Sequence, residues 1–215
     1  MFITIEGIEG SGKSTVAERI HEMAVGAGIE AVLTREPGGT EISEKIRTLL
    51  LDPQNRSLSP LAELFLYLAS RAQLVDEVIE PKLSSGVMVI CDRFMDASVA
   101  YQGFARHLGE ELIEELNKLA VRDAEPDVTF LLDLPVEAGF ERGPISRDAR
   151  GIASMDRLEQ EERSFHEDVR RGYIRLAERH SERVFVIDAT RPLGEVIDSV
   201  ISILEHKFGL DLKKK

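Results

Sequence analysis

The chain has 215 residues, of which 43% are hydrophobic and 31% are charged, and its net charge at pH 7 is −12. This length predicts a single domain spanning 1–215, and the composition argues against disordered, fibrous and membrane-spanning proteins. The negative charge also opposes non-specific binding to nucleic acids and to anionic membranes, so neither partner is expected.

Five short apolar runs rich in β-branched residues recur along the chain, separated by longer helical patterns. Because parallel strands need crossover connections, such alternation predicts a parallel sheet covered by helices on both faces. The expected fold class is therefore α/β, a three-layer α/β/α domain with roughly five parallel strands. The expected strands are Phe2–Ile5, Ala31–Leu33, Val87–Ile90, Val128–Leu132 and Val184–Ile187.

Glycine and proline mark the expected helix boundaries. Gly28 and Gly86 can end helices in the left-handed conformation, and Pro60 is typical of a first helical turn. From Leu61 to Ile79, apolar residues recur at the spacing of a core-facing stripe, which predicts a helix buried along one side.

The chain start and the single cysteine bear on location. The first residues have no basic region and no small-residue cleavage site, so they are interpreted as a strand and not as a secretory signal. The only cysteine, Cys91, has no partner for an internal disulfide and is expected in the core. Both features favour a reducing compartment, with the cytoplasm as the expected location.

A glycine-rich motif follows the first expected strand and precedes an amphipathic helix. Its residues, Gly-Ile-Glu-Gly-Ser-Gly-Lys-Ser, match the phosphate-binding pattern G-x-x-x-x-G-K-[ST]. Backbone N–H groups of such a turn point at phosphate oxygens, and the helix dipole adds to the attraction. Lys13 is expected to bridge the β and γ phosphates, and Ser14 to ligate Mg²⁺. A chance glycine turn is the alternative. The predicted ATP-binding residues here are Gly7, Ile8, Glu9, Gly10, Ser11, Gly12, Lys13, Ser14 and Thr15.

The motif leaves the phosphoryl acceptor open, since the same cradle serves kinases, switches and motors. The chain has no Asn-Lys-x-Asp guanine-reading motif, which disfavours an ordinary GTPase. Asp92 and Arg93 follow the third expected strand, where open parallel sheets bind their ligands. Asp92 is expected to hold a metal-bound water and Arg93 a phosphate, with both charges facing the cradle.

Six motifs in chain order resemble the thymidylate kinases, which make dTDP from dTMP and ATP. The resemblance covers nearly the whole chain and implies ATP and dTMP as partners, Mg²⁺ as cofactor and a homodimer packed through helices. Phe94 stands where the family more often has Tyr or His, and Ala97 where serine is common. The motifs are Phe2–Thr15, Thr34–Thr40, Ala69–Gln73, Asp92–Phe94, Ala100–Gly103 and Asp156–Glu159.

The resemblance implies a thymine site on the helix that begins near residue 60. Tyr67 matches the aromatic residue that stacks on the base, and Arg71 matches the arginine that reaches the carbonyl O4. Arginine only donates hydrogen bonds, so it suits a carbonyl and rejects the amino group of cytosine. On a helical wheel both residues lie beside the apolar stripe, at the border of a groove. A surface ion pair and an amphipathic tyrosine are the alternative.

Further positions are implied around the sugar and the base edge. Ser98 matches a polar position near the base edge, and Gln102 is close enough in sequence to share that role. Tyr101 matches the residue that crowds the sugar 2′ position and favours deoxyribose. Pro37 and Arg47 are assigned to the same substrate site.

The acceptor phosphate and its surroundings complete the implied site. Arg35 and Arg93 match the arginines that hold this phosphate, although a salt bridge between Arg35 and Glu36 is an alternative. Glu9 matches the acidic residue near the sugar 3′-hydroxyl and the Mg²⁺ water shell, so Glu9 and Asp92 would both act on the metal through water.

An arginine-rich segment at about 141–156 resembles the lid of a bacterial-type thymidylate kinase, in which Gly10 stands where other members have an arginine. The lid then supplies the catalytic arginine, an effect worth roughly 10³ to 10⁵ in rate. Arg147 and Arg150 are the candidates, and a solvated loop is the alternative. Arg142 is expected to stack on adenine.

The predicted catalytic set is Lys13, Glu9, Arg93, Arg147 and Arg150. Arg191 is expected to rim the adenine pocket, and residues 209–215 to form a frayed tail. Two other functions stay open. One is a kinase for another nucleoside monophosphate or a deoxynucleoside, and the other is a nucleotide-gated switch protein.

Overall fold

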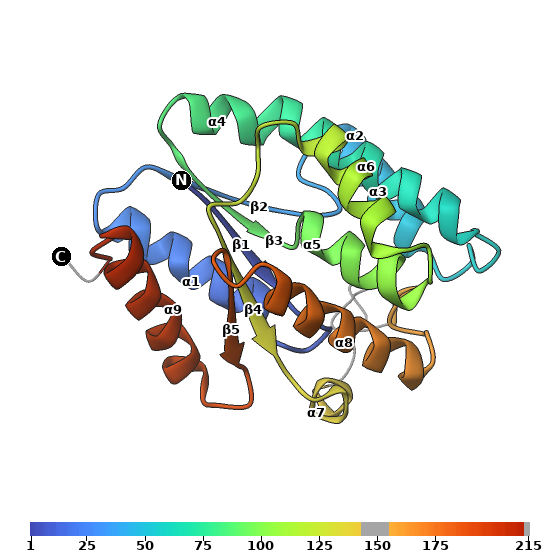
Figure 1. Cartoon of the computed structure of the whole chain (residues 1–215). Helices are drawn as coiled ribbons and strands as arrows, with labels where there is room; N and C mark the ends of the chain where they lie inside the picture. The colour runs from blue at the N-terminus through green and yellow to red at the C-terminus, as the bar shows by residue number, and fades with distance from the viewer. Residues whose placement is uncertain (143–154, 213–215) are drawn as a thin grey trace.

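The computed structural model describes residues 1–142 and 155–212, and Figure 1 shows their arrangement. A sheet of five parallel strands lies at the centre, in the order β2-β3-β1-β4-β5. The expected fold class is confirmed. The strands are β1 (Phe2–Glu6), β2 (Ala31–Arg35), β3 (Met88–Asp92), β4 (Val128–Asp133) and β5 (Val184–Asp188).

All five strands lie where the sequence predicts them, and each continues beyond its apolar run. The ladder between β2 and β3 ends on the pair Arg35 and Asp92, and the ladder between β4 and β5 ends on Asp133 and Asp188. The paired strands therefore end in polar side chains at the carboxyl edge of the sheet. At this edge the two faces of the sheet do not have to be apolar.

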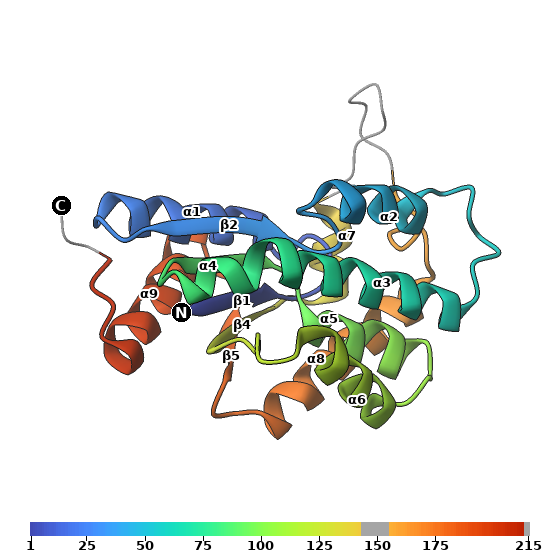
Figure 2. The same cartoon turned by 90° about the horizontal axis from the view of Figure 1, so that it is seen from above.

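Helices cover both faces of the sheet. Figures 1 and 2 show α1 and α9 side by side next to the sheet, whereas α3, α6 and α8 lie on its other side. The helical segments, including the π-helical η1 and η2, are α1 (Lys13–Gly26), α2 (Glu41–Leu51), α3 (Pro60–Leu74), η1 (Val75–Ile79), α4 (Glu80–Ser84), α5 (Met95–Ser98), η2 (Val99–Ala105), α6 (Glu110–Val121), α7 (Val136–Glu141), α8 (Arg163–Arg179) and α9 (Leu193–Phe208).

The side chains of β1 alternate between the two faces, as strand geometry requires. Ile3 and Ile5 pack in the large apolar cluster that includes the buried face of α1. Phe2 belongs to a second cluster, with Leu74 and Val75. Glu6 continues this second face at the end of the strand, so a carboxyl group enters the protein interior beside the glycine-rich turn.

The predicted helix boundaries are confirmed at both glycines and at the start of α3. Gly28 and Gly86 have φ angles of 80° and 78°. Ser59 caps α3, accepting a hydrogen bond from the N–H of Ala62, and Pro60 occupies the first turn. The apolar stripe runs on to Ile79 as predicted, but its last five residues form the π-helical η1. No helix in residues 1–142 and 155–212 is long and apolar enough to cross a membrane.

Candidate functional site

The glycine-rich turn joins β1 to α1, and its side chains and backbone fold around the Lys13 amino group. Lys13 Nζ donates to the carbonyl of Ile8 at 2.7 Å. Burial and the neighbouring Arg93 lower the pKa of Lys13 to about 8. A buried amino group in a glycine-rich turn is suited to bind a polyphosphate, whose negative charge would restore the amino group's ordinary pKa.

Two positions in the turn require glycine for close approach. A Cβ at Gly7, where φ is 144°, would lie 2.6 Å from the carbonyl oxygen of Leu132. A Cβ at Gly10, where φ is 77°, would lie 2.8 Å from the carbonyl oxygen of Gly139 in α7. The turn is therefore fixed against β4 and α7 by backbone contacts that leave no room for a side chain.

Side-chain oxygen atoms from the start of α1 and from the end of β3 meet at the carboxyl edge of the sheet. The Ser14 hydroxyl donates to Asp92 Oδ2 at 2.5 Å. Within the described ranges no cluster of three or more His, Cys, Asp or Glu side chains is arranged to hold a metal ion. A cation here would thus take these oxygens together with oxygens of a ligand.

Arg93 lies at the centre of a second charged group. Its guanidinium donates to the carbonyl of Gly7 at 2.9 Å and to Glu9 Oε1 at 2.9 Å. The Tyr101 hydroxyl donates to the same Glu9 oxygen at 2.6 Å. Burial opposes ionisation of Glu9, but Arg93, His166 and Lys13 hold the pKa of this carboxyl well below its usual range. Glu9 is therefore an anion at neutral pH. Arg93 faces the turn as a cation.

The backbone at Arg93 is in the left-handed region, with φ of 66°. Glu6 holds the next residue, since its Oε1 accepts from the Phe94 N–H at 2.7 Å. Glu6 Oε2 accepts from the Tyr173 hydroxyl at 2.7 Å, and Arg93 donates to that hydroxyl oxygen at 3.3 Å. Burial, with a smaller contribution from Asp96, raises the pKa of Glu6 to about 8.

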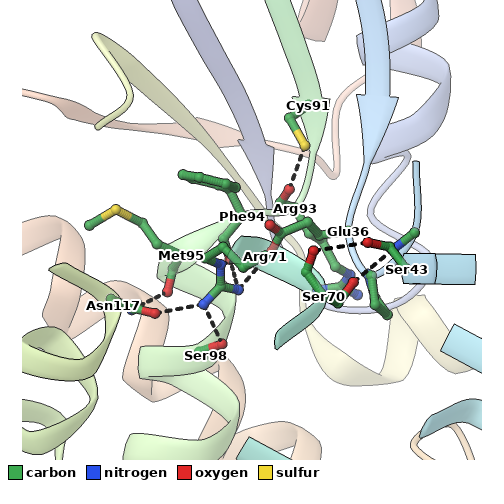
Figure 3. A network of polar contacts seen from close by, with 12 residues as sticks. Glu36, Ser43, Ser70, Arg71, Cys91, Arg93, Phe94, Met95, Ser98 and Asn117 are labelled. Atoms are coloured by element: carbon green, nitrogen blue, oxygen red, sulfur yellow. Dashed lines mark hydrogen bonds and ion pairs between the residues drawn. The ribbon is translucent and has the colours of Figure 1, made fainter. Parts of the chain in front are cut away.

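Arg71 on α3 is buried, with 1% of its surface exposed. Its Nε and Nη2 donate to Glu36 Oε2 at 2.9 and 2.7 Å, and Nη2 also donates to the carbonyl of Phe94 at 3.0 Å. Its Nη1 donates to Asn117 Oδ1 and to Ser98 Oγ (Figure 3). Arg71 also lines the cavity described below, and its ion pair with Glu36 is in the interior and not on the surface.

One cavity of about 390 Å³ joins the glycine-rich turn to the Arg71 network. It brings together 17 of the residues predicted for the site, which come from the glycine-rich turn and the start of α1, the sheet edge, the loop after β2, the helices α2, α3, α5 and η2, and the end of α7. They are Glu9, Gly10, Gly12, Lys13, Ser14, Thr15, Arg35, Pro37, Arg47, Tyr67, Arg71, Asp92, Arg93, Ser98, Tyr101, Gln102 and Arg142.

Several of these residues have partners that the sequence did not predict. Arg35 pairs with Glu44 at 2.7 Å, not with its neighbour Glu36. Arg47 donates to the carbonyl of Pro37 at 2.7 Å. Gln102 Nε2 donates to Glu63 Oε1 at 2.8 Å.

Other predicted residues lie outside this cavity. Gly7 and Ser11 form the turn itself, Ile8 borders a smaller cavity behind it, and Arg191 pairs with Glu195 at 2.8 Å. Arg142, which does line the cavity, donates from Nη1 to the carbonyl of Gly10 at 2.5 Å, so it holds the turn directly. Arg147 and Arg150 lie outside the described residues.

Five residues that support the site were not predicted for it. Glu6 and Tyr173 hold the Arg93 turn, Glu36 and Asn117 hold Arg71, and His166 Nδ1 lies 3.3 Å from Glu9 Oε2. Of these residues, Glu6 could have been noticed in the sequence. It is a charged residue at the end of an apolar strand, just before the glycine-rich turn, and charged residues are rarely buried.

Comparison with known proteins shows the family of the chain. The sequence model of the family described as thymidylate kinase matches residues 5–200. A thymidylate kinase of Desulfosudis oleivorans is 51% identical over 208 residues, which cover 96% of this chain and 97% of the relative. One of Desulfovibrio desulfuricans is 48% identical, with 95% of each chain covered. The crystal structure of thymidylate kinase from Ehrlichia chaffeensis superposes with a TM-score of 0.75 at 34% identity, covering 95% of this chain and 98% of that one. On these matches, the chain belongs to the thymidylate kinase family.

Proposed function

We propose that this phosphotransferase moves the γ-phosphoryl group of ATP to the phosphate of dTMP, giving ADP and dTDP. The observation that carries the proposal is the single cavity that joins the Lys13 turn at one end to Tyr67 and Arg71 at the other. A donor bound at the turn and a pyrimidine nucleotide bound beside Tyr67 would meet end to end, with their phosphates between them.

The donor phosphates would lie on the turn. Lys13 and the N–H groups of the turn would neutralise and orient them, and Arg142 keeps the turn in place through its bond to the Gly10 carbonyl. The acceptor phosphate would lie near Arg93 and Arg35, which both line the cavity. Because a phosphate oxygen is already anionic at neutral pH, the transfer needs no strong general base.

Mg²⁺ fits the donor set of this site. Ser14 Oγ and Asp92 Oδ2 are oxygen ligands of the kind that Mg²⁺ prefers, and their number leaves positions for phosphate oxygens and water. Ser14 would be a direct ligand, and Asp92 and Glu9 would act through bound water. When present, the ion supplies charge neutralisation at the β and γ phosphates.

The thymine base would lie between Tyr67 and the Arg71 network. Tyr67 is half-buried and lines the cavity, so its ring can stack on a base. Arg71 and Ser98 offer donors at the base edge, which match a carbonyl at position 4. Tyr101, fixed by Glu9, would crowd a ribose 2′-hydroxyl.

The remaining roles rest on the family resemblance. Arg147 and Arg150 are proposed as catalytic arginines of the lid, Arg142 and Arg191 as neighbours of adenine, and Pro37, Arg47 and Gln102 as substrate-binding residues. A homodimer and a cytoplasmic location are proposed on the same ground.

A coupled assay that follows ADP release across acceptors tests the function. We expect turnover with dTMP to exceed turnover with dCMP or free thymidine, and release without an acceptor to be slow. Higher turnover with dCMP or with thymidine would assign another acceptor. Slow release that dTMP does not accelerate would instead favour a nucleotide-gated switch.

A further inference from the structure

Asn117 lies on α6 and is fully buried, and it is not among the residues that line the cavity. Its side-chain oxygen Oδ1 accepts a hydrogen bond from Arg71 Nη1 at 2.6 Å, and its Nδ2 donates to the carbonyl of Met95 at 2.9 Å. Figure 3 shows Asn117 beside the guanidinium, between Arg71 and Met95. A helix that does not line the cavity is thus connected to the arginine assigned to the base.

The Met95 carbonyl fixes the orientation of the Asn117 amide. If the amide were reversed, its NH₂ group would face the Arg71 guanidinium, and its oxygen would face the Met95 oxygen. Both contacts would place like groups together, donor on donor and acceptor on acceptor. The amide oxygen is therefore held on the Arg71 side.

The guanidinium has five N–H donors, and all five have acceptors. Glu36 Oε2 accepts from Nε and from one N–H of Nη2, and the Phe94 carbonyl accepts from the other N–H of Nη2. Asn117 and Ser98 accept from the two N–H groups of Nη1. The bond to Ser98 is longer, at 3.1 Å, and Ser98 lines the cavity whereas Asn117 does not. The N–H directed at Ser98 is therefore the donor that a base carbonyl could share.

We propose that Asn117 is a positioning residue for base selection. It holds one N–H of Nη1, so the other faces the cavity and favours a pyrimidine with a carbonyl at position 4 over one with an amino group. This inference rests on the proposed function, because it assigns the base to the Arg71 end of the cavity. Without Asn117, that N–H of Nη1 has no acceptor, and Ser98 is the residue left to orient the Nη1 group toward the base.

The test compares the Kd values of dTMP and dCMP by isothermal titration in the full-length protein. In Asn117→Leu, which cannot accept a hydrogen bond, we expect the preference for dTMP over dCMP to fall about tenfold. The KM for ATP should stay the same. Ile113→Val, a change at a fully buried residue one turn earlier on α6, is the matched control and should keep the preference.

Asn117→Asp separates recognition from packing. It keeps an oxygen on Arg71, but its second oxygen faces the Met95 carbonyl, so we expect lower thermal stability with most of the dTMP preference retained. If Asn117→Leu does not fold, Asn117→Ser is used instead. The serine side chain is too short to contact both Arg71 Nη1 and the Met95 carbonyl. An unchanged preference in a folded Leu or Ser variant, or a preference that follows stability across all variants, would overturn the proposal. Failure of the wild-type protein to phosphorylate dTMP would instead refute the proposed function.

Discussion

Glu6 allows a quantitative test of the buried network behind Arg93. Glu6 is fully buried, and its pKa is about 8 because of desolvation, compared with 4.5 for an exposed carboxyl. Between these two pKa values the unfolded chain has released this proton while the folded protein still holds it. Stability from Glu6 is therefore fully present below about pH 4.5 and is lost as the pH rises through about 8.

The size of the effect follows from the shift. Each pH unit in this window changes the unfolding free energy by about 1.4 kcal/mol, so about 2.5 kcal/mol is lost between about pH 5 and pH 7. Glu6→Gln resembles the protonated acid in shape and does not titrate. Its carbonyl oxygen can still accept from the Phe94 N–H.

Urea unfolding at a series of pH values, with wild type and Glu6→Gln measured side by side, tests this expectation. The difference between the two unfolding free energies should move by about 2.5 kcal/mol in favour of the variant from about pH 5 to pH 7. Glu18→Gln, a change at an exposed carboxylate on α1, is the control and should follow wild type at every pH. If the curves for Glu6→Gln and wild type run parallel, Glu6 has an ordinary pKa and the reasoning is wrong.

The remaining predictions concern the proposed reaction. Lys13→Ala should lower kcat on the order of 10²-fold or more. In the wild-type enzyme, kcat/KM for ATP should fall above about pH 8, where Lys13 loses its proton, and a flat profile would contradict its role. Arg71→Ala should raise the KM for dTMP far more than the KM for ATP, and equal effects on both would exclude Arg71 from the base site. Arg150→Ala should lower kcat more than ATP affinity, and the lid assignment fails if both Arg147→Ala and Arg150→Ala are kinetically silent.

The sheet and the phosphate-binding turn could be predicted because their signals are local. Each strand is a short apolar run, and the turn needs its glycines and Lys13 within a few consecutive residues. The polar ends of the strands were missed, since Arg35 and Asp133 belong to the sheet through ladder pairing alone.

The supporting residues could not be predicted because their contacts join distant parts of the chain. Glu6 and Tyr173 are 167 residues apart, and Arg71 and Asn117 are 46 apart. A helical wheel placed Arg71 beside a groove, but it could not reveal that Asn117, Ser98 and Glu36 would satisfy its charge in the interior. Such contacts depend on how α3, α5 and α6 pack, and no spacing in the sequence encodes that packing.

The contact between Gly10 and Gly139 limits how this enzyme can change. A Cβ at Gly139 would lie 2.7 Å from the carbonyl oxygen of Glu9, so each backbone excludes a side chain from the other. An arginine introduced at position 10 would have to push α7 away from the turn and adopt a left-handed backbone conformation that suits glycine. The arginines proposed for the segment after α7 therefore have no simple replacement at position 10, because an arginine there would also require α7 to move.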